Sequence, residues 1–357
     1  MHGSQTSVPS GTTPPESIGE EAHPQLAREW DAYVERHPDA TFFHRYDWLA
    51  VVARAFRYRA VPLVARREGR ITGVLPLAIV PGLPWGRFLV STPQAVYGGP
   101  LADDEKTRQA LLRSARDLAL RLRARYVEYR SVVAMPALPA KDLYVTFRRG
   151  IAATAEENMA MIPRNQRRSI RIGLKSGLVS QIGGQDLLPE FYSVYSASVR
   201  NLGTPVFPRA LFTGLLAAYP DDVRILLVRR EQVAVAGVLT LFFRDQVLPY
   251  YGGALKEGFR YGVNDFMYWQ LHLHGMERGY RVFDFGRSKR GSGSFDFKRH
   301  WGFEPTQLHY QYDLVGQREI PDLSPRNPRF SLVITAWKRM PLWLSRRLGP
   351  VLVRYFP

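Results

Sequence analysis

Three consecutive stretches decide the fold of this chain: VAVAGVLTLFF (233–243), QVLPYYGGALKEGFRYGVNDFMYWQLHLHGMERGY (246–280) and RVFDFGRSKRGSGSFDFKRHWGFEP (281–305). The first is rich in β-branched and aromatic residues, and residues 247–252 form its expected hairpin partner. A helix is expected to begin at Asn264, as its N-cap, and to end before Gly279. A short apolar strand at residues 281–285 follows. Strand, turn, helix and strand in this order predict an α/β module.

An earlier part of the chain repeats this order. A hairpin is expected within residues 60–79, an amphipathic helix at 107–125 and a strand at 126–130. The loop sequence Tyr97-Gly-Gly corresponds to Tyr251-Gly-Gly in the later copy. The repeat predicts two tandem modules of the same kind.

Several motifs in the second copy resemble the FemAB family, and more closely the FemAB-type proteins associated with the PEP-CTERM and exosortase systems of exopolysaccharide-producing bacteria. The resemblance covers roughly residues 42–314 and is strongest in the last third of that span. The motifs are Tyr250-Tyr-Gly-Gly253, Arg260, Asn264, Tyr268-Trp269, Phe283-Asp-Phe-Gly-Arg-Ser288 and Ser294-Phe-Asp-Phe-Lys-Arg-His-Trp-Gly302.

The expected fold class is α/β (α+β), with two tandem GNAT-like acyltransferase modules. Each would have a mixed central sheet flanked by helices. The expected division is a disordered leader at 1–23, a first module at 24–155, a second FemAB-like module at 156–315 and a basic amphipathic tail at 316–357.

Composition limits the class of protein. The 357 residues carry a formal charge of +17, which implies attraction to a nucleic acid, an anionic lipid surface or phosphate-bearing substrates, unless the whole proteome is basic. The absence of cysteine excludes disulfides, zinc–thiolate sites and thiol nucleophiles. No signal peptide and no long apolar run are visible, so the expected location is the cytoplasm.

Some classes of chemistry lack their motifs in this sequence. No Gly-x-Ser-x-Gly nucleophile motif and no His-Glu-x-x-His motif occurs. His272 and His274 are two residues apart and would face different sides of a helix, so no metal site is expected. Acyl transfer to an amine needs only a polarised carbonyl and an aligned amine, so it stays open.

Three residues are candidates for catalysis. Asp284 lies in an apolar strand, where a charge requires a partner, so it is either held by Arg or backbone donors or acts as a base with a raised pKa. The resemblance implies that Lys298 steadies phosphate or developing negative charge. Tyr251, like the substrate-binding candidate Tyr250, could orient the carbonyl or the amine, or be a core residue.

The expected substrate contacts come from two regions. At the end of the last strand lie Arg287 and Ser288, credible anion ligands, with Trp301 nearby. The turn Arg260-Tyr-Gly-Val-Asn264 contains only part of the GNAT phosphate-binding pattern. This departure leaves the donor open between acyl-CoA and aminoacyl-tRNA, which the FemAB resemblance implies.

Two basic segments remain. Residues 164–175 carry five basic residues and no acid, and Arg164, Arg168 and Arg171 are expected to meet phosphates of tRNA or of a lipid-linked precursor. Residues 331–356 alternate Trp and Leu with Lys and Arg, as an interfacial membrane helix does, or as a helix docked on its own domain or on a partner.

The resulting hypothesis is an N-acyltransferase, cytoplasmic and peripheral to the inner membrane, whose acceptor is an amine on a peptidoglycan or exopolysaccharide precursor. The partners would be that anionic or lipid-linked precursor and tRNA. Two alternatives stay open: a non-catalytic scaffold of an exopolysaccharide system, and an RNA-binding protein that uses residues 164–175.

Overall fold

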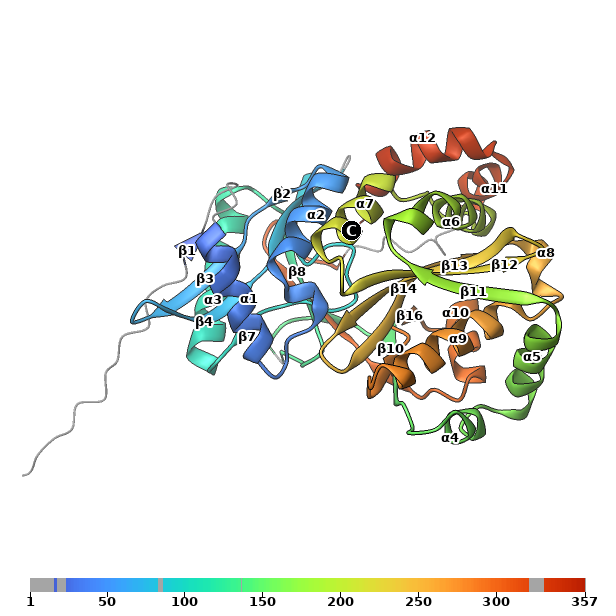
Figure 1. The fold of residues 1–357 in the computed structure, drawn as a ribbon. Helices are drawn as coiled ribbons and strands as arrows, with labels where there is room; N and C mark the ends of the chain where they lie inside the picture. Colours follow the sequence, from blue (N-terminus) through green and yellow to red (C-terminus); the bar gives the residue numbers. More distant parts are fainter. Residues whose placement is uncertain (1–15, 18–23, 83–85, 136, 321–330, 357) are drawn as a thin grey trace, which may run out of the picture.

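The computed structural model describes residues 16–17, 24–82, 86–135, 137–320 and 331–356. Two β-sheet modules lie side by side, and the C-terminal helices lie on the second (Figure 1). This mixed α/β architecture confirms the expected fold class. The expected leader lies outside the described residues except at 16–17. The sequence also predicts a Pro-rich linker at 320–328, which lies outside them except for residue 320.

The first module has a six-stranded sheet in the order β2-β5-β6-β8-β18-β9 and a four-stranded sheet in the order β1-β3-β4-β7. Strands β6 and β8 run parallel, and α3 connects them. Its elements are β1 (Glu16–Ser17), α1 (Pro24–Arg36), η1 (Phe42–His44), α2 (Tyr46–Phe56), β2 (Arg59–Ala60), β3 (Leu63–Arg67), β4 (Arg70–Leu75), β5 (Leu77–Gly82), β6 (Gly86–Ser91), β7 (Leu101–Ala102), α3 (Glu105–Arg121), β8 (Tyr126–Ser131) and β9 (Ala140–Lys141).

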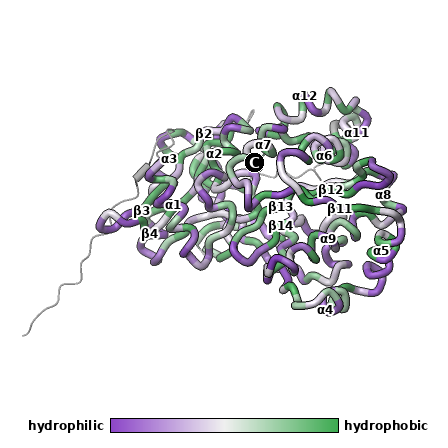
Figure 2. Tube along the Cα trace, in the orientation of Figure 1, coloured by the Kyte–Doolittle hydropathy of each residue, from purple (hydrophilic) through white to green (hydrophobic). Residues whose placement is uncertain are grey.

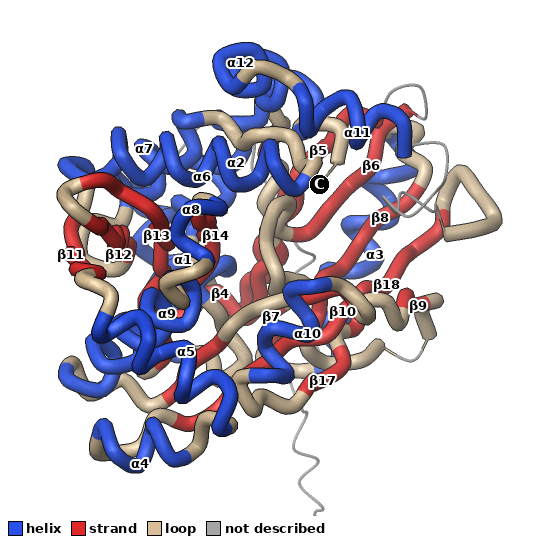
Figure 3. Tube along the Cα trace, turned by 90° about the vertical axis from the view of Figure 1, so that its right-hand side faces the viewer, coloured by secondary structure: helices blue, strands red, loops and turns tan. Residues whose placement is uncertain are grey.

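The second module is built on the sheet β11-β12-β13-β14-β15-β10-β16, with β17 also paired to β10. Helix α6 covers one face of this sheet and α9 the other (Figures 1 and 3). Its elements are β10 (Tyr144–Gly150), α4 (Ala155–Ala160), α5 (Arg164–Lys175), β11 (Leu178–Gly183), η2 (Gln185–Leu187), α6 (Leu188–Leu202), α7 (Arg209–Ala218), β12 (Val223–Arg230), β13 (Val233–Phe243), β14 (Gln246–Ala254), α8 (Lys256–Phe259), α9 (Val263–Glu277), β15 (Val282–Asp284), β16 (Ser288–Lys289), α10 (Gly293–His300) and β17 (Pro305–Gln307).

The two sheets exchange strands. β10 precedes the expected boundary at residue 155, yet it pairs with β15, β16 and β17 of the second sheet. β18 (His309–Leu314) follows the second module in the chain, yet it pairs with β8 and β9 of the first sheet. The two sheets therefore do not separate at one point of the chain, and the division into 24–155 and 156–315 stays a proposal.

Helix α9 begins one residue before the expected position. Gly262, with φ of 65°, is its N-cap, so Asn264 is the second residue of the helix and not the cap. A Cβ at Gly262 would lie 2.5 Å from the carbonyl oxygen of Ser169 on α5. The left-handed φ and the close approach of α5 both favour glycine at this position. The general preference for Asn at an N-cap takes neither of them into account.

The core continues from one module into the other. One buried cluster joins Trp48 and Tyr97 of the first module to Phe212 and Leu241 of the second. A second cluster lies between α9 and the sheet of the second module, and a third lies under α3. Because the main cluster is shared, the two modules are packed as one unit.

The tail folds as two helices, α11 (Ser331–Arg339) and α12 (Leu342–Val353), separated at Pro341. Both dock on α6 (Figure 1). The indole of the buried Trp337 donates to the carbonyl of Thr204, and Arg346 donates to the hydroxyl of Ser196 at 2.8 Å. Of the two expectations for this segment, the docked helix is present.

No helix among the described residues combines the length and the apolar character needed to cross a membrane.

Candidate active site

The candidate site forms where β14 and β15 part. These parallel strands pair only at Gln246↔Val282 and Val247↔Phe283. Beyond these residues β14 continues to Ala254 without β15 beside it. Residues 92–99 of the first module contact both strands at this point. Tyr250 on β14 donates to the carbonyl of Gln94 at 2.7 Å.

Asp284, the last residue of β15, is buried and bonded on both carboxylate oxygens. Tyr97 donates to Oδ2 at 2.7 Å and the Gly286 amide donates to Oδ1 at 2.7 Å. Arg148 forms an ion pair with Oδ2 at 3.3 Å, and Thr146 donates to Oδ1. Burial raises the pKa of this carboxyl, while Arg148 and the hydrogen bonds oppose the shift. The carboxylate thereby joins the first module to the end of β15.

Lys298 on α10 points at the same turn. Its ammonium nitrogen lies 3.0 Å from the carbonyl oxygens of both Gly286 and Arg287. Burial lowers the pKa of Lys298 to about 7, while Asp284 raises it and Arg287 lowers it further. A lysine with this pKa is present in both protonation states near neutral pH, so it can donate or accept a proton.

Arg287 is a half-buried cation held by aromatic rings. Its guanidinium lies 4.6 Å from the ring centroid of Tyr144 and donates to the Tyr310 hydroxyl at 3.2 Å. No carboxylate among the described residues forms an ion pair with it. The nearby Arg130, in contrast, is paired with Glu128 at 2.8 Å. The unpaired charge of Arg287 is suited to an anionic group of a substrate.

The two tyrosines of β14 face different surroundings. Tyr250 is the extra residue of a β-bulge, because Leu239 pairs with Tyr251 and Thr240 with Pro249. Tyr251 is buried among Tyr195 and Phe212 on the α6 side, and its hydroxyl has no hydrogen-bond partner. The structure therefore brings Tyr250 to the 92–99 loop but places Tyr251 in an aromatic core.

The remaining candidates are spread over the second module. Ser288 is buried beside Arg287, and its hydroxyl has no hydrogen-bond partner among the residues that the structure describes. Trp301 is a core residue whose indole donates to Asp265 at 2.8 Å. Arg260 is exposed and lies over the ring of Tyr261, 4.7 Å from its centroid, and Asn264 is half-buried. Only Ser288 of these four lies at the turn that holds Lys298.

The predicted basic helix is α5, and it presents its arginines to solvent. Arg164, Arg168 and Arg171 are exposed, and none of them forms an ion pair with a described residue. Figure 2 shows the strongly hydrophilic character of this segment. The apolar side of α5 packs on α9, where a Cβ at Gly173 would lie 2.7 Å from Phe266. The helix thus covers the start of α9 and turns its charge outward.

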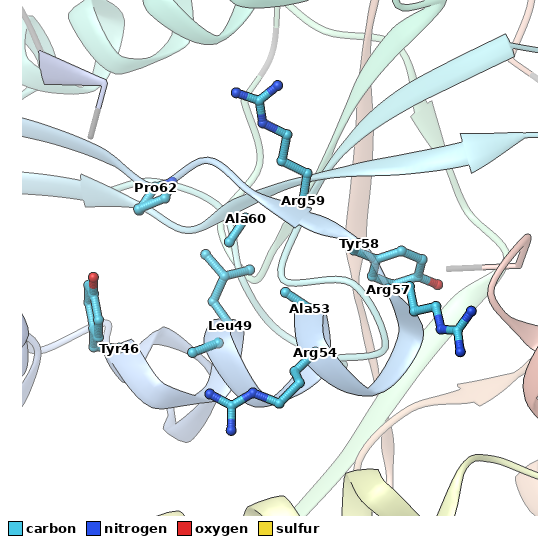
Figure 4. Close-up of a pocket in the computed structure, with 10 residues that line it drawn as sticks. Tyr46, Leu49, Ala53, Arg54, Arg57, Tyr58, Arg59, Ala60 and Pro62 are labelled. Carbon is cyan, nitrogen blue, oxygen red and sulfur yellow. The ribbon is translucent and has the colours of Figure 1, made fainter. Parts of the chain in front are cut away.

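A separate surface pocket of about 500 Å³ lies between α2 and β2. Arg54, Arg57 and Arg59 are at its rim, but their side chains point away from one another (Figure 4). None of the predicted site residues lines this pocket. It offers no converging set of polar groups, and it is not the candidate site.

Sequence reasoning missed the residues that β10 and the 92–99 loop supply. Tyr97, Thr146 and Arg148 all bind Asp284, although they lie more than 130 residues before it in the chain. The alternation in β10, YVTFRRG, is the only local signal for that strand. No group of three or more His, Asp or Glu residues suited to a metal ion occurs within the described ranges.

Comparisons with known proteins identify the domain. Residues 163–299, from the start of α5 into α10, match the family model described as an acetyltransferase (GNAT) domain. A search of curated proteins finds no match. The chain therefore carries a GNAT-like acetyltransferase domain that includes the turn with Asp284 and Lys298.

Solved structures show a similar fold over most of the chain. The structure of FemX has a TM-score of 0.66 at 16% identity and covers 89% of this chain and 100% of its own. The C-terminal domain of a putative lysylphosphatidylglycerol synthetase from Agrobacterium fabrum gives 0.53 at 16%, covering 80% and 91%. A tandem GNAT protein from the clavulanic acid biosynthesis pathway gives 0.52 at 11%, covering 85% and 99%. At these identities the likeness shows the fold alone, which is that of a tandem GNAT-type acyltransferase.

Proposed function

We propose that this protein is an N-acyltransferase that moves an aminoacyl or acyl group onto an amine of an anionic cell-envelope precursor. The observation that carries the proposal is Lys298, a buried lysine whose pKa lies at about 7 and whose nitrogen is held at the end of β15. Burying a lysine costs free energy. A fold that nevertheless buries one beside the point where two strands diverge favours a chemical role for that lysine.

The roles of the neighbours follow from their contacts. Two N–H groups of the Lys298 ammonium point at the carbonyls of Gly286 and Arg287, which leaves the third for the reacting acyl group. As the acceptor amine attacks, that N–H stabilises the oxyanion. The C–O or C–S bond of the donor then breaks, Lys298 protonates the departing oxygen or sulfur, and the proton that the amine loses returns to Lys298. Asp284 is fully bonded, so we assign it the positioning of the 284–287 turn.

The donor that α5 favours is aminoacyl-tRNA. In this fold an acyl-CoA pyrophosphate would lie on the first amides of α9, where α5 packs against Gly262. Arg230 donates to the last turn of α5 at Ser176 and lies over Tyr261, beside Arg260. The exposed cations thus form a continuous row from α5 to α8, which is the arrangement that binding an RNA phosphate backbone requires. Acyl-CoA remains the second donor to be tested.

The acceptor is proposed from charge. Arg287 offers an unpaired guanidinium next to Lys298, suited to a phosphate or carboxylate on an amine-bearing precursor. The FemAB resemblance supports a peptidoglycan intermediate, the name of the lysylphosphatidylglycerol synthetase supports a lipid, and the PEP-CTERM resemblance supports an exopolysaccharide precursor. The site of action would be the cytoplasmic side of the inner membrane.

The test measures donor binding and donor discharge in the same protein. Thermal shifts with acetyl-CoA, longer acyl-CoAs and charged tRNA identify the donor. Transfer is then measured as the movement of a labelled acyl group from that donor to amine-bearing envelope precursors. We expect Lys298→Met to lose about 10²–10⁴-fold in kcat/KM while it binds donor as the wild type does. The activity of the wild type should fall above pH of about 7, where the ammonium deprotonates.

The matched control is Lys106→Met, which removes an exposed lysine on α3. It should leave both donor binding and transfer unchanged. A Lys298→Met protein that transfers at the rate of the wild type contradicts the proposed chemistry. Absence of a thermal shift with every donor would favour the scaffold hypothesis instead.

A further inference from the structure

Helix α12 has two apolar faces, and α6 covers only one of them. At about 3.6 residues per turn, Ser345, Gly349 and Val353 share the docked face, and all three are buried. The fit is close, because a Cβ at Gly349 would lie 2.5 Å from the carbonyl oxygen of Val206. Docking therefore uses this face completely.

The opposite face is apolar and exposed. Trp343 is 67% exposed and Val351 is 52% exposed, and they lie two turns apart on the same side of the helix. Leu348 borders this face, and Leu352, at the edge of the docked face, and Phe356, just beyond the helix, are also exposed. A large exposed tryptophan among aliphatic side chains is unusual for a surface that faces water only.

The charge around this face has one sign. Arg347 lies on it, and Lys338 and Arg339 are exposed at the end of α11. From residue 323 to the end the sequence holds seven basic residues and no acidic one. Because this segment of the chain has no acidic group, it attracts anions, and an anionic lipid bilayer combines a negative surface with an apolar interior.

We infer that the outward face of α12, made of Trp343, Arg347, Leu348 and Val351, docks on an anionic lipid surface. The helix lies in the plane of the interface, with Trp343 and Val351 among the acyl chains and Arg347 at the headgroups. Docking on α6 fixes the helix before it meets lipid, so no ordering of the tail is required on binding.

This surface is connected to the candidate site. Gln94 donates to the carbonyl of Phe356 at 2.9 Å and accepts from Tyr250 at 2.7 Å. The end of the tail thus contacts the 92–99 loop, from which Tyr97 reaches Asp284. Lipid docking would bring the site close to a lipid-linked acceptor. That consequence rests on the proposed function, whereas lipid binding itself does not.

The experiment measures co-sedimentation of the full-length protein with vesicles of phosphatidylcholine, with and without phosphatidylglycerol. We expect binding to the phosphatidylglycerol vesicles and a fall of about tenfold or more in the partition coefficient for the double variant Trp343→Ser, Val351→Asn. The control variant Val179→Asn, Phe259→Ser removes one valine and one aromatic residue from exposed positions elsewhere and should bind like the wild type.

Two further measurements separate the outcomes. Far-UV circular dichroism and the Tm show that both double variants are folded, and light scattering reports the oligomeric state. Unchanged vesicle binding by the α12 variant overturns the inference. So does a wild type whose binding does not depend on phosphatidylglycerol, or a wild type that is a dimer and becomes a monomer in this variant. Lys298→Met should bind vesicles like the wild type, so failure of the proposed chemistry and failure of lipid docking are distinguishable.

Discussion

At the residue scale, the site depends on how burial changes one lysine. Lys298 is 8% exposed, and its nitrogen contacts the carbonyl oxygens of Gly286 and Arg287 and lies near two aromatic rings. The motif around it indicated an important residue, but the sequence could not show its environment. Its partners come from the turn after β15, and Asp284, which raises its pKa, is itself held by Tyr97 from the other module.

The lowered pKa of Lys298 predicts a specific dependence of stability on pH. The folded protein holds the proton with a pKa of about 7 and the unfolded chain with 10.5, so between these values the unfolded state binds more protons. Stability from this group therefore rises as pH increases from 7 to 10.5. The free energy of unfolding of wild type minus Lys298→Met, from urea titrations, should rise over that range.

The comparison with Lys298→Met cancels the other titrating groups. The variant also removes the donor to the carbonyls of Gly286 and Arg287, which adds to the difference in free energy of unfolding an offset that is constant with pH. A difference between wild type and Lys298→Met that does not change with pH would show that the lysine is not desolvated.

At the element scale, local patterns predicted the elements that have local causes. The strand at 233–243 and the helix beginning near Asn264 were predicted within one residue. The partners of β10 and β18 were not predictable, since strand pairing between distant segments leaves no local pattern beyond alternation. The fold class therefore followed from sequence, while three of the four contacts described for Asp284, those with Tyr97, Thr146 and Arg148, did not.

Helix α5 gives the prediction that belongs to this scale. Replacing Arg164, Arg168 and Arg171 by Gln should weaken tRNA binding and reduce the salt dependence of its affinity by a slope of roughly 2–3, since three phosphate contacts are lost. Filter binding over a salt series measures this. The control carries Gln at the exposed Arg113, Arg121 and Arg123 of the first module. Equal slopes for the two triple variants would exclude α5 as the RNA surface.

At the scale of the whole molecule, the exchanged strands and the shared core predict a single unfolding transition. Leu63→Ala in the first module and Leu226→Ala in the second remove buried side chains from different clusters. Each should shift the same transition by about 2–5 kcal/mol. Fluorescence and circular dichroism should give coincident curves. Two resolved transitions, each moved by only one variant, would mean that the modules unfold independently.

The order in which the chain leaves the ribosome is affected by the same exchange. Most multidomain proteins complete an N-terminal domain while the rest is still being made. Here β8 cannot pair with β18 until residue 314 has emerged from the ribosome. By then most of the polypeptide is already outside the ribosome. During that interval the edge of β8 is open to other chains. A nascent chain of this protein is therefore a natural client for chaperones that shield unpaired strands.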